Sequence, residues 1–135
     1  MIVTIERPTA SGKSVVAEAL AKKLGFYYLP TGWFYRAVAY LLVSNCGYSE
    51  EALAKVSDEA ITQCIDITRL VYTYDENKGG ALYYDQQDIT SFLKDYMIDR
   101  YVAIISPLGN VRRLVTQAQR AFAKTHDSVI EGRDI

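Results

Sequence analysis

The sequence contains few cysteines, few prolines, a single histidine and no long apolar run. Two cysteines, Cys46 and Cys64, with one histidine are too few for a disulfide scaffold or a Cys/His zinc site, so we expect reduced thiols. No apolar run approaches the ~18 residues of a membrane span, and no basic leader with an apolar core precedes the first residues. These absences predict a cytoplasmic protein without a membrane segment.

The chain also lacks an excess of either charge, since 15 basic and 16 acidic residues give a net charge of −1. Without a positive field we expect no polymeric nucleic acid as a partner, whereas a small anionic ligand needs only a local group of cations. Half of the 135 residues are hydrophobic. A chain of this length can bury roughly two thirds of its unfolded surface, which predicts a globular protein with a real core.

The N-terminal stretch has the pattern of a strand, a tight turn and a helix. Residues 1–5 are apolar and mostly β-branched, and from Lys13 onward Val15, Val16, Ala19 and Leu20 share one helical face. The turn ends in Gly12-Lys13-Ser14, which is typical of a phosphate-binding loop at a helix N-terminus. In such a loop Lys13 would reach the β- and γ-phosphates of a nucleotide and Ser14 would bind Mg²⁺.

The strict form of this motif has glycine at its first position, where this chain has Arg7. Arg7 brings a Cβ and a long side chain to a tight turn, although its charge favours an anion. An ordinary strand-turn-helix connection is the alternative interpretation.

The rest of the chain alternates strand-like and helical segments around a small β insert. We expect a strand at residues 26–29, helices over residues 33–42 and from Ser49 to about Ile61, a β-hairpin with its turn at residues 75–80, a helix at residues 110–124, and a third parallel strand at residues 128–130. We also expect a helix at residues 101–105, with a strand as the alternative because of their β-branched content. Arg36 falls in the first turn of the second helix, where the helix dipole disfavours a cation unless an anion lies nearby. A solvated surface arginine is the alternative. Glu131-Gly132-Arg133-Asp134 leaves the carboxyl end of the last strand, where ligands bind in open α/β sheets.

Five segments in this order resemble the bacterial cytidylate kinases. They are Ser11-Gly12-Lys13-Ser14, the segment Thr31-Gly32-Trp33-Phe34-Tyr35-Arg36-Ala37, a hairpin ending in Gln87-Asp88-Ile89-Thr90, Val111-Arg112-Arg113 with Gln119-Arg120, and Glu131-Gly132-Arg133-Asp134. The resemblance implies an α/β fold of the P-loop nucleoside monophosphate kinase type, with helices on both faces of a parallel sheet and a small antiparallel β insert. It divides the chain into an N-terminal core part at residues 1–62, a nucleoside-monophosphate-binding insert at residues 63–105 and a return to the core at residues 106–135.

The resemblance also implies phosphoryl transfer from ATP to CMP or dCMP with Mg²⁺. The residues that it assigns to ATP are Pro8, Thr9, Ala10, Ser11, Gly12, Lys13 and Ser14, with Ser14 also on the metal. The residues that it assigns to the acceptor nucleotide are Thr31, Arg36, Arg112, Arg133 and Asp134, and it makes Lys13, Arg36 and Arg133 catalytic.

The chain departs from the family pattern at several of these places. Arg7 replaces a loop glycine, Pro30 replaces an aspartate before Thr31-Gly32, and Ala103 stands near an expected serine that helps to read cytosine. Family members also continue for several dozen residues beyond the counterpart of Asp134. We therefore expect a truncated, incomplete fold whose first strand is an exposed sheet edge that invites self-association.

Two other functions stay open. The chain is alternatively a non-catalytic, truncated or degenerate nucleotide-binding module that needs a partner to complete its fold. It is alternatively a phosphate-loop kinase for adenylate or another small metabolite.

Overall fold

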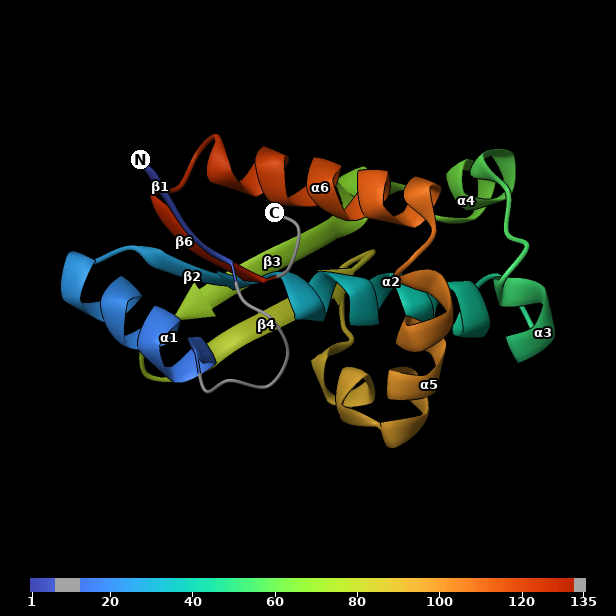
Figure 1. Cartoon of the computed structure of the whole chain (residues 1–135), viewed down its shortest axis with the longest axis horizontal. Helices are drawn as coiled ribbons and strands as arrows, with labels where there is room; N and C mark the ends of the chain where they lie inside the picture. The colour runs from blue at the N-terminus through green and yellow to red at the C-terminus, as the bar shows by residue number, and fades with distance from the viewer. Residues whose placement is uncertain (7–12, 133–135) are drawn as a thin grey trace.

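The computed structural model describes residues 1–6 and 13–132, apart from the side chains of residues 13 and 14 (Figure 1). The elements are β1 (Ile2–Glu6), α1 (Lys13–Leu24), β2 (Tyr27–Pro30), α2 (Thr31–Ser44), α3 (Glu50–Leu53), α4 (Asp58–Cys64), η1 (Ile67–Arg69), β3 (Leu70–Asp75), β4 (Gly79–Tyr84), β5 (Gln87–Asp88), η2 (Thr90–Lys94), α5 (Tyr96–Ile105), α6 (Gly109–Ala123) and β6 (Ser128–Gly132), where η marks a 3-10 helix. No helix in this part of the chain is both long and apolar enough to cross a bilayer.

The strands β1, β6 and β2 form a parallel sheet in that order at the left of the view, and helices flank it (Figure 1). The last strand in sequence is the middle strand, since Ile130 pairs with Thr4 on one side and Leu29 on the other. All five residues of β6 are buried. This arrangement confirms the predicted parallel α/β sheet, and among the described strands β1 lies at its edge.

A second, antiparallel sheet in the order β3-β4-β5 forms the predicted hairpin insert. Tyr72 pairs with Leu82 across β3 and β4. The turn between them is fixed by Asp75, whose Oδ1 accepts the backbone N–H groups of Asn77 at 2.7 Å and Lys78 at 3.0 Å. The two-residue strand β5 was not predicted.

The single helix predicted from Ser49 to about Ile61 is wrong, because the segment forms two short helices, α3 and α4. Each helix has its own serine N-cap. Ser49 Oγ accepts the N–H of Ala52 at 3.2 Å, and Ser57 Oγ accepts the N–H of Ala60 at 3.1 Å. Because Ser57 has the extended backbone angles of an N-cap residue, a single helix cannot continue through it.

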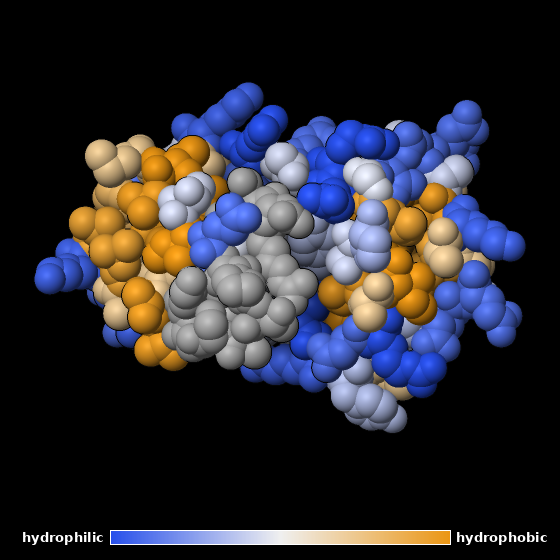
Figure 2. Space-filling view, in the orientation of Figure 1, coloured by the Kyte–Doolittle hydropathy of each residue, from blue (hydrophilic) through white to orange (hydrophobic). Residues whose placement is uncertain are grey.

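The apolar face predicted for the first helix is also wrong. Ala17 and Ala21 face the sheet and are fully buried, whereas Val15 and Val16 are 74% and 60% exposed. Alanine allows the helix to lie close against β2 and β6, which the larger valines would prevent. The valines instead contribute to an apolar surface near α1 (Figure 2).

The main core runs without interruption through α2, the insert and α6. Leu42 of α2, Leu82 and Leu93 of the insert and Val111 of α6 are all buried in it. The hydroxyl of Tyr72 on β3 also donates to the carbonyl of Tyr28 on β2 at 2.5 Å. The insert predicted at residues 63–105 is therefore packed into the same core as the segments on either side of it.

This attachment predicts a loss of stability in alkali. Burial raises the pKa of Tyr72, and burial with the Glu18 carboxylate nearby raises the pKa of Tyr74 to about 12. Since both values lie above the ~10 of an unfolded tyrosine, the stabilisation is complete below pH ~10 and is lost as the pH rises through the folded-state values. We expect the urea midpoint to fall from about pH 10 upward, and to fall less in Tyr72→Phe.

At pH 8 the Tyr72→Phe chain should be less stable by about 1 kcal/mol, because it lacks the hydrogen bond to Tyr28. Urea titrations of both proteins at a series of pH values measure these effects. An identical pH dependence in the two proteins would show that Tyr72 is not a source of the alkaline sensitivity.

Candidate functional site

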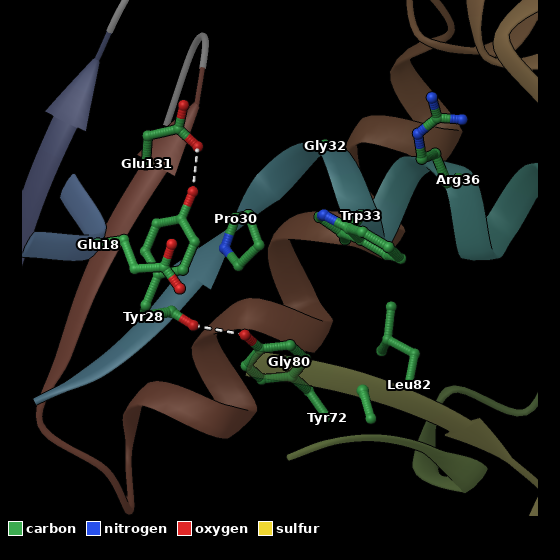
Figure 3. A pocket seen from close by; sticks show the side chains of 11 residues that line it. Glu18, Tyr28, Pro30, Gly32, Trp33, Arg36, Tyr72, Gly80, Leu82 and Glu131 are labelled. Carbon is green, nitrogen blue, oxygen red and sulfur yellow. Dashed lines mark hydrogen bonds between the residues drawn. The ribbon is translucent and has the colours of Figure 1, made fainter. Parts of the chain in front are cut away.

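A cavity of about 430 Å³, here called the first cavity, lies where the carboxyl ends of β2 and β6 meet the insert (Figure 3). Its lining residues are Glu18, Tyr28, Pro30, Gly32, Trp33, Arg36, Tyr72, Gly80, Ala81, Leu82 and Glu131. The part of the wall that the structure describes is thus largely aromatic and apolar, with one arginine and two carboxylates. Aromatic and apolar side chains of this kind suit a planar ligand.

Arg36 is the cation among the described lining residues of this cavity, and the insert holds its side chain. Its Nη1 donates to the carbonyl of Leu93 in η2 at 3.0 Å, and its Nη2 pairs with the carboxylate of Asp99 in α5. Because α2 begins at Thr31, Arg36 lies in the second turn rather than in the predicted first turn. The helix-dipole argument for an anion therefore does not apply, and Asp99 supplies the negative charge instead.

Glu131 places a buried carboxylate at the carboxyl end of the middle strand. It is 2% exposed, and the hydroxyl of Tyr28 donates to its Oε2 at 3.3 Å. It pairs in register with Ile5 of β1, the strand that leads toward Lys13 and Ser14. The sequence analysis placed Glu131 in the segment at the ligand-binding end of the last strand but assigned it no role of its own.

Glu131 is a carboxylate on the strand next to β1. Phosphate-loop nucleotide hydrolases hold Mg²⁺ between the loop serine and a carboxylate on a neighbouring strand. Glu131 offers hard oxygen ligands of the kind that Mg²⁺ prefers, on the strand next to β1. Among the described residues, however, no group of three or more His, Cys, Asp or Glu side chains could hold a metal ion.

Thr31, predicted to bind the acceptor, lies at a tight junction between β6 and α2. Its side chain is 4% exposed, and its Oγ1 accepts from Nε2 of the buried Gln119 at 2.6 Å. A Cβ built on Gly132 would lie 2.6 Å from both Cβ and Oγ1 of Thr31. The glycine at this position is therefore required by close packing.

A second cavity of about 830 Å³ runs along α6, and four of its eight described lining residues are basic. It is lined by Tyr35, Arg112, Arg113, Thr116, Gln117, Arg120, Ala121 and Lys124. Three of its cations, Arg112, Arg120 and Lys124, are spaced by multiples of four and so share a helix face. Arg36 and Arg112, both predicted to bind the acceptor, thus line different cavities. The two cavities are neighbours at α2, where Tyr35 lines the second and Arg36 lines the first.

Several predicted site residues lie outside the described residues. These are Pro8, Thr9, Ala10, Ser11 and Gly12 of the loop, Arg133 and Asp134. Lys13 and Ser14 begin α1, but their side chains are outside the description. The flanking β1 and α1 confirm the strand and the helix around the loop, and the assignment of these residues to ATP, metal and acceptor stays a prediction.

Comparison with known proteins extends over the whole chain. Residues 3–135 match the family described as cytidylate kinase. The cytidylate kinase of Thermodesulfovibrio yellowstonii is 33% identical over 134 residues, which cover 99% of this chain and 58% of that protein. The cytidylate kinase of Carboxydothermus hydrogenoformans is 34% identical over 136 residues, covering 100% of this chain and 58% of that protein.

A third relative, the cytidylate kinase of Ureaplasma urealyticum, is 33% identical, and the match covers 98% of this chain and 55% of that protein. The chain thus spans between 55% and 58% of the length of these three relatives. The match begins in β1 and includes α2, the insert, α6 and the Glu131-Gly132 end of β6. On this match the chain belongs to the cytidylate kinase family.

Proposed function

We propose that this chain provides the phosphate loop and the acceptor-side arginines for phosphoryl transfer from ATP to CMP or dCMP, giving ADP and CDP or dCDP. The proposal rests on the family match over residues 3–135. The presence of Arg36 at the carboxyl end of the parallel sheet supports it, since ligands of open α/β sheets bind there. ATP and CMP are cytoplasmic metabolites, so the proposed activity implies a cytoplasmic location.

Phosphoryl transfer needs positioning and charge neutralisation more than covalent chemistry. In the proposed reaction Lys13 holds the donor phosphates, while Arg36 and Arg133 hold the acceptor phosphate. A planar guanidinium suits this task because it donates to two phosphate oxygens at once. Thr31, Arg112 and Asp134 bind the rest of the acceptor nucleotide in this proposal, which requires a ligand that reaches from the first cavity past Tyr35 to Arg112 in the second cavity.

We also propose Mg²⁺ as the metal bound with ATP, held by Ser14 and Glu131. The ion would supply positive charge to the β- and γ-phosphates during transfer. The burial of Glu131 supports this role, because a carboxylate removed from water binds a hard cation strongly when one is present. Tyr28 orients this carboxylate through its hydroxyl.

A coupled assay of ADP release tests the proposed function, with Mg²⁺-ATP and a panel of CMP, dCMP, UMP and AMP as acceptors. Thermal-shift titrations with CMP and with ATP accompany it, because a ligand that binds only the folded chain must raise the melting temperature. Release of ADP with CMP or dCMP would confirm the proposal. Binding without turnover would favour a nucleotide-binding module, and turnover that prefers AMP would favour a different phosphate-loop kinase.

We propose further that the edge of β1 pairs with the same edge of a second copy. Among the described strands β1 is bonded only to β6, and Met1 and Ile2 are 79% and 52% exposed. An apolar edge strand pairs readily with another chain, and a lysine on it blocks this pairing. We expect sedimentation to show concentration-dependent association of the wild type but not of Ile2→Lys. A wild-type monomer at every concentration would contradict the proposal.

A further inference from the structure

We propose that Asp99 is a positioning residue for Arg36, and that it presents the Arg36 guanidinium to the phosphate of the acceptor nucleotide. The inference rests on the proposed function for the identity of the ligand. The contacts between Asp99 and Arg36 support the positioning role whatever the ligand is.

Two nitrogen atoms of the Arg36 guanidinium, Nη1 and Nη2, are bonded to the insert. The residue belongs to α2, whereas both of its acceptors, the Leu93 carbonyl and the Asp99 carboxylate, belong to the insert. The helices α2 and α5 pack against each other, so the two acceptors have fixed places relative to the backbone of Arg36. Two anchors in one guanidinium plane set both the position and the orientation of that plane.

The anchored guanidinium retains donors for a ligand. Arginine has five N–H groups in one plane, and the two described bonds use one on Nη1 and one on Nη2. Arg36 lines the first cavity together with Gly32 and Trp33 (Figure 3). A phosphate in that cavity would meet a donor group whose side chain is already ordered, which lowers the entropic cost of binding.

The exposure of the pair separates a positioning role from a role in folding. The Arg36 side chain is 28% exposed and the Asp99 side chain is 63% exposed. Ion pairs with such access to water contribute little to folding stability. Loss of Asp99 should therefore change phosphate binding and the motion of Arg36, while the melting temperature stays close to that of the wild type.

Asp99→Asn and Asp99→Glu of the full chain test the inference, with Glu50→Gln as the matched control. Glu50 pairs with Arg100, the neighbour of Asp99 on α5, at 2.8 Å, so the control breaks an exposed ion pair of the same helix without touching Arg36. The measurements are the dissociation constants of CMP and ATP by calorimetry, and the ¹⁵N relaxation of the Arg36 Nε–H in the ligand-free chain.

We expect Asp99→Asn to weaken CMP binding by roughly three- to tenfold through loss of a charge-assisted hydrogen bond, with ATP binding unchanged. The Arg36 Nε–H should become more mobile. Asp99→Glu should restore part of both effects, and Glu50→Gln should match the wild type. Tighter CMP binding by Asp99→Asn would overturn the inference, because it would make Asp99 a competitor of the phosphate, and so would unchanged binding.

The relaxation measurement tests the positioning role of Asp99 separately from the proposed function. If the wild type binds no CMP, the proposed function fails, and the motion of Arg36 alone decides whether Asp99 positions it. Unchanged motion in Asp99→Asn overturns the inference whatever the nucleotide does.

Discussion

Arg36→Ala should weaken CMP binding by about 10- to 100-fold, because hydrogen bonds to a charged group contribute about 1.5–3 kcal/mol. Among the residues that the structure describes, Arg36 is the cation that lines the first cavity, at the carboxyl end of the sheet. Its removal also leaves the Leu93 carbonyl and the Asp99 carboxylate without this donor. Calorimetric titration of CMP into the wild type and the variant measures the effect.

Two comparisons make this result specific to the acceptor phosphate. ATP binding should not change in Arg36→Ala, since the predicted donor site is the loop before α1. Arg36→Lys keeps the charge but loses the planar fork, so it should fall between the wild type and the alanine variant. Equal CMP affinity in all three proteins would remove Arg36 from the site.

The elements that the sequence predicted well are those whose signal is local and strong. The helix predicted at residues 110–124 is found at Gly109–Ala123, and the hairpin turn predicted at residues 75–80 is found between β3 and β4. A wide apolar stripe determines the first, and the turn residues determine the second. The break between α3 and α4 was missed because the apolar spacing continues across it, and only the second serine cap at Ser57 reveals it.

The candidate site was less predictable, because tertiary contacts define it. The sequence singled out Arg36, but its partners Leu93 and Asp99 are more than fifty positions away in the chain. Burial of Glu131 depends on β6 being the middle strand, which no local pattern specifies. The buried alanines of α1 show the same limit, since valine is the more apolar residue and yet the sheet accepts only the smaller one.

Gly132→Ala should destabilise the chain by about 2–3 kcal/mol, the upper part of the range for overpacking a well-filled site. The new methyl group would lie 2.6 Å from both Cβ and Oγ1 of Thr31. Neither atom can move away easily, because Thr31 is the first residue of α2, is buried, and accepts a hydrogen bond from Gln119. Either β6 or the start of α2 must shift. Urea unfolding of the variant measures the cost.

Gly32→Ala is the matched control, one residue from Thr31. A Cβ on Gly32 would meet nothing within 4 Å, so the same chemical change should leave stability unchanged or raise it by up to ~1 kcal/mol through helix propensity. Thr31→Gly removes both atoms that the Gly132→Ala methyl group would meet. The double variant Thr31→Gly/Gly132→Ala should therefore be less destabilised than the sum of the single variants. Strict additivity would show that the cost of Gly132→Ala does not arise from Thr31. The close approach of β6 to α2 would then not explain why residue 132 is glycine.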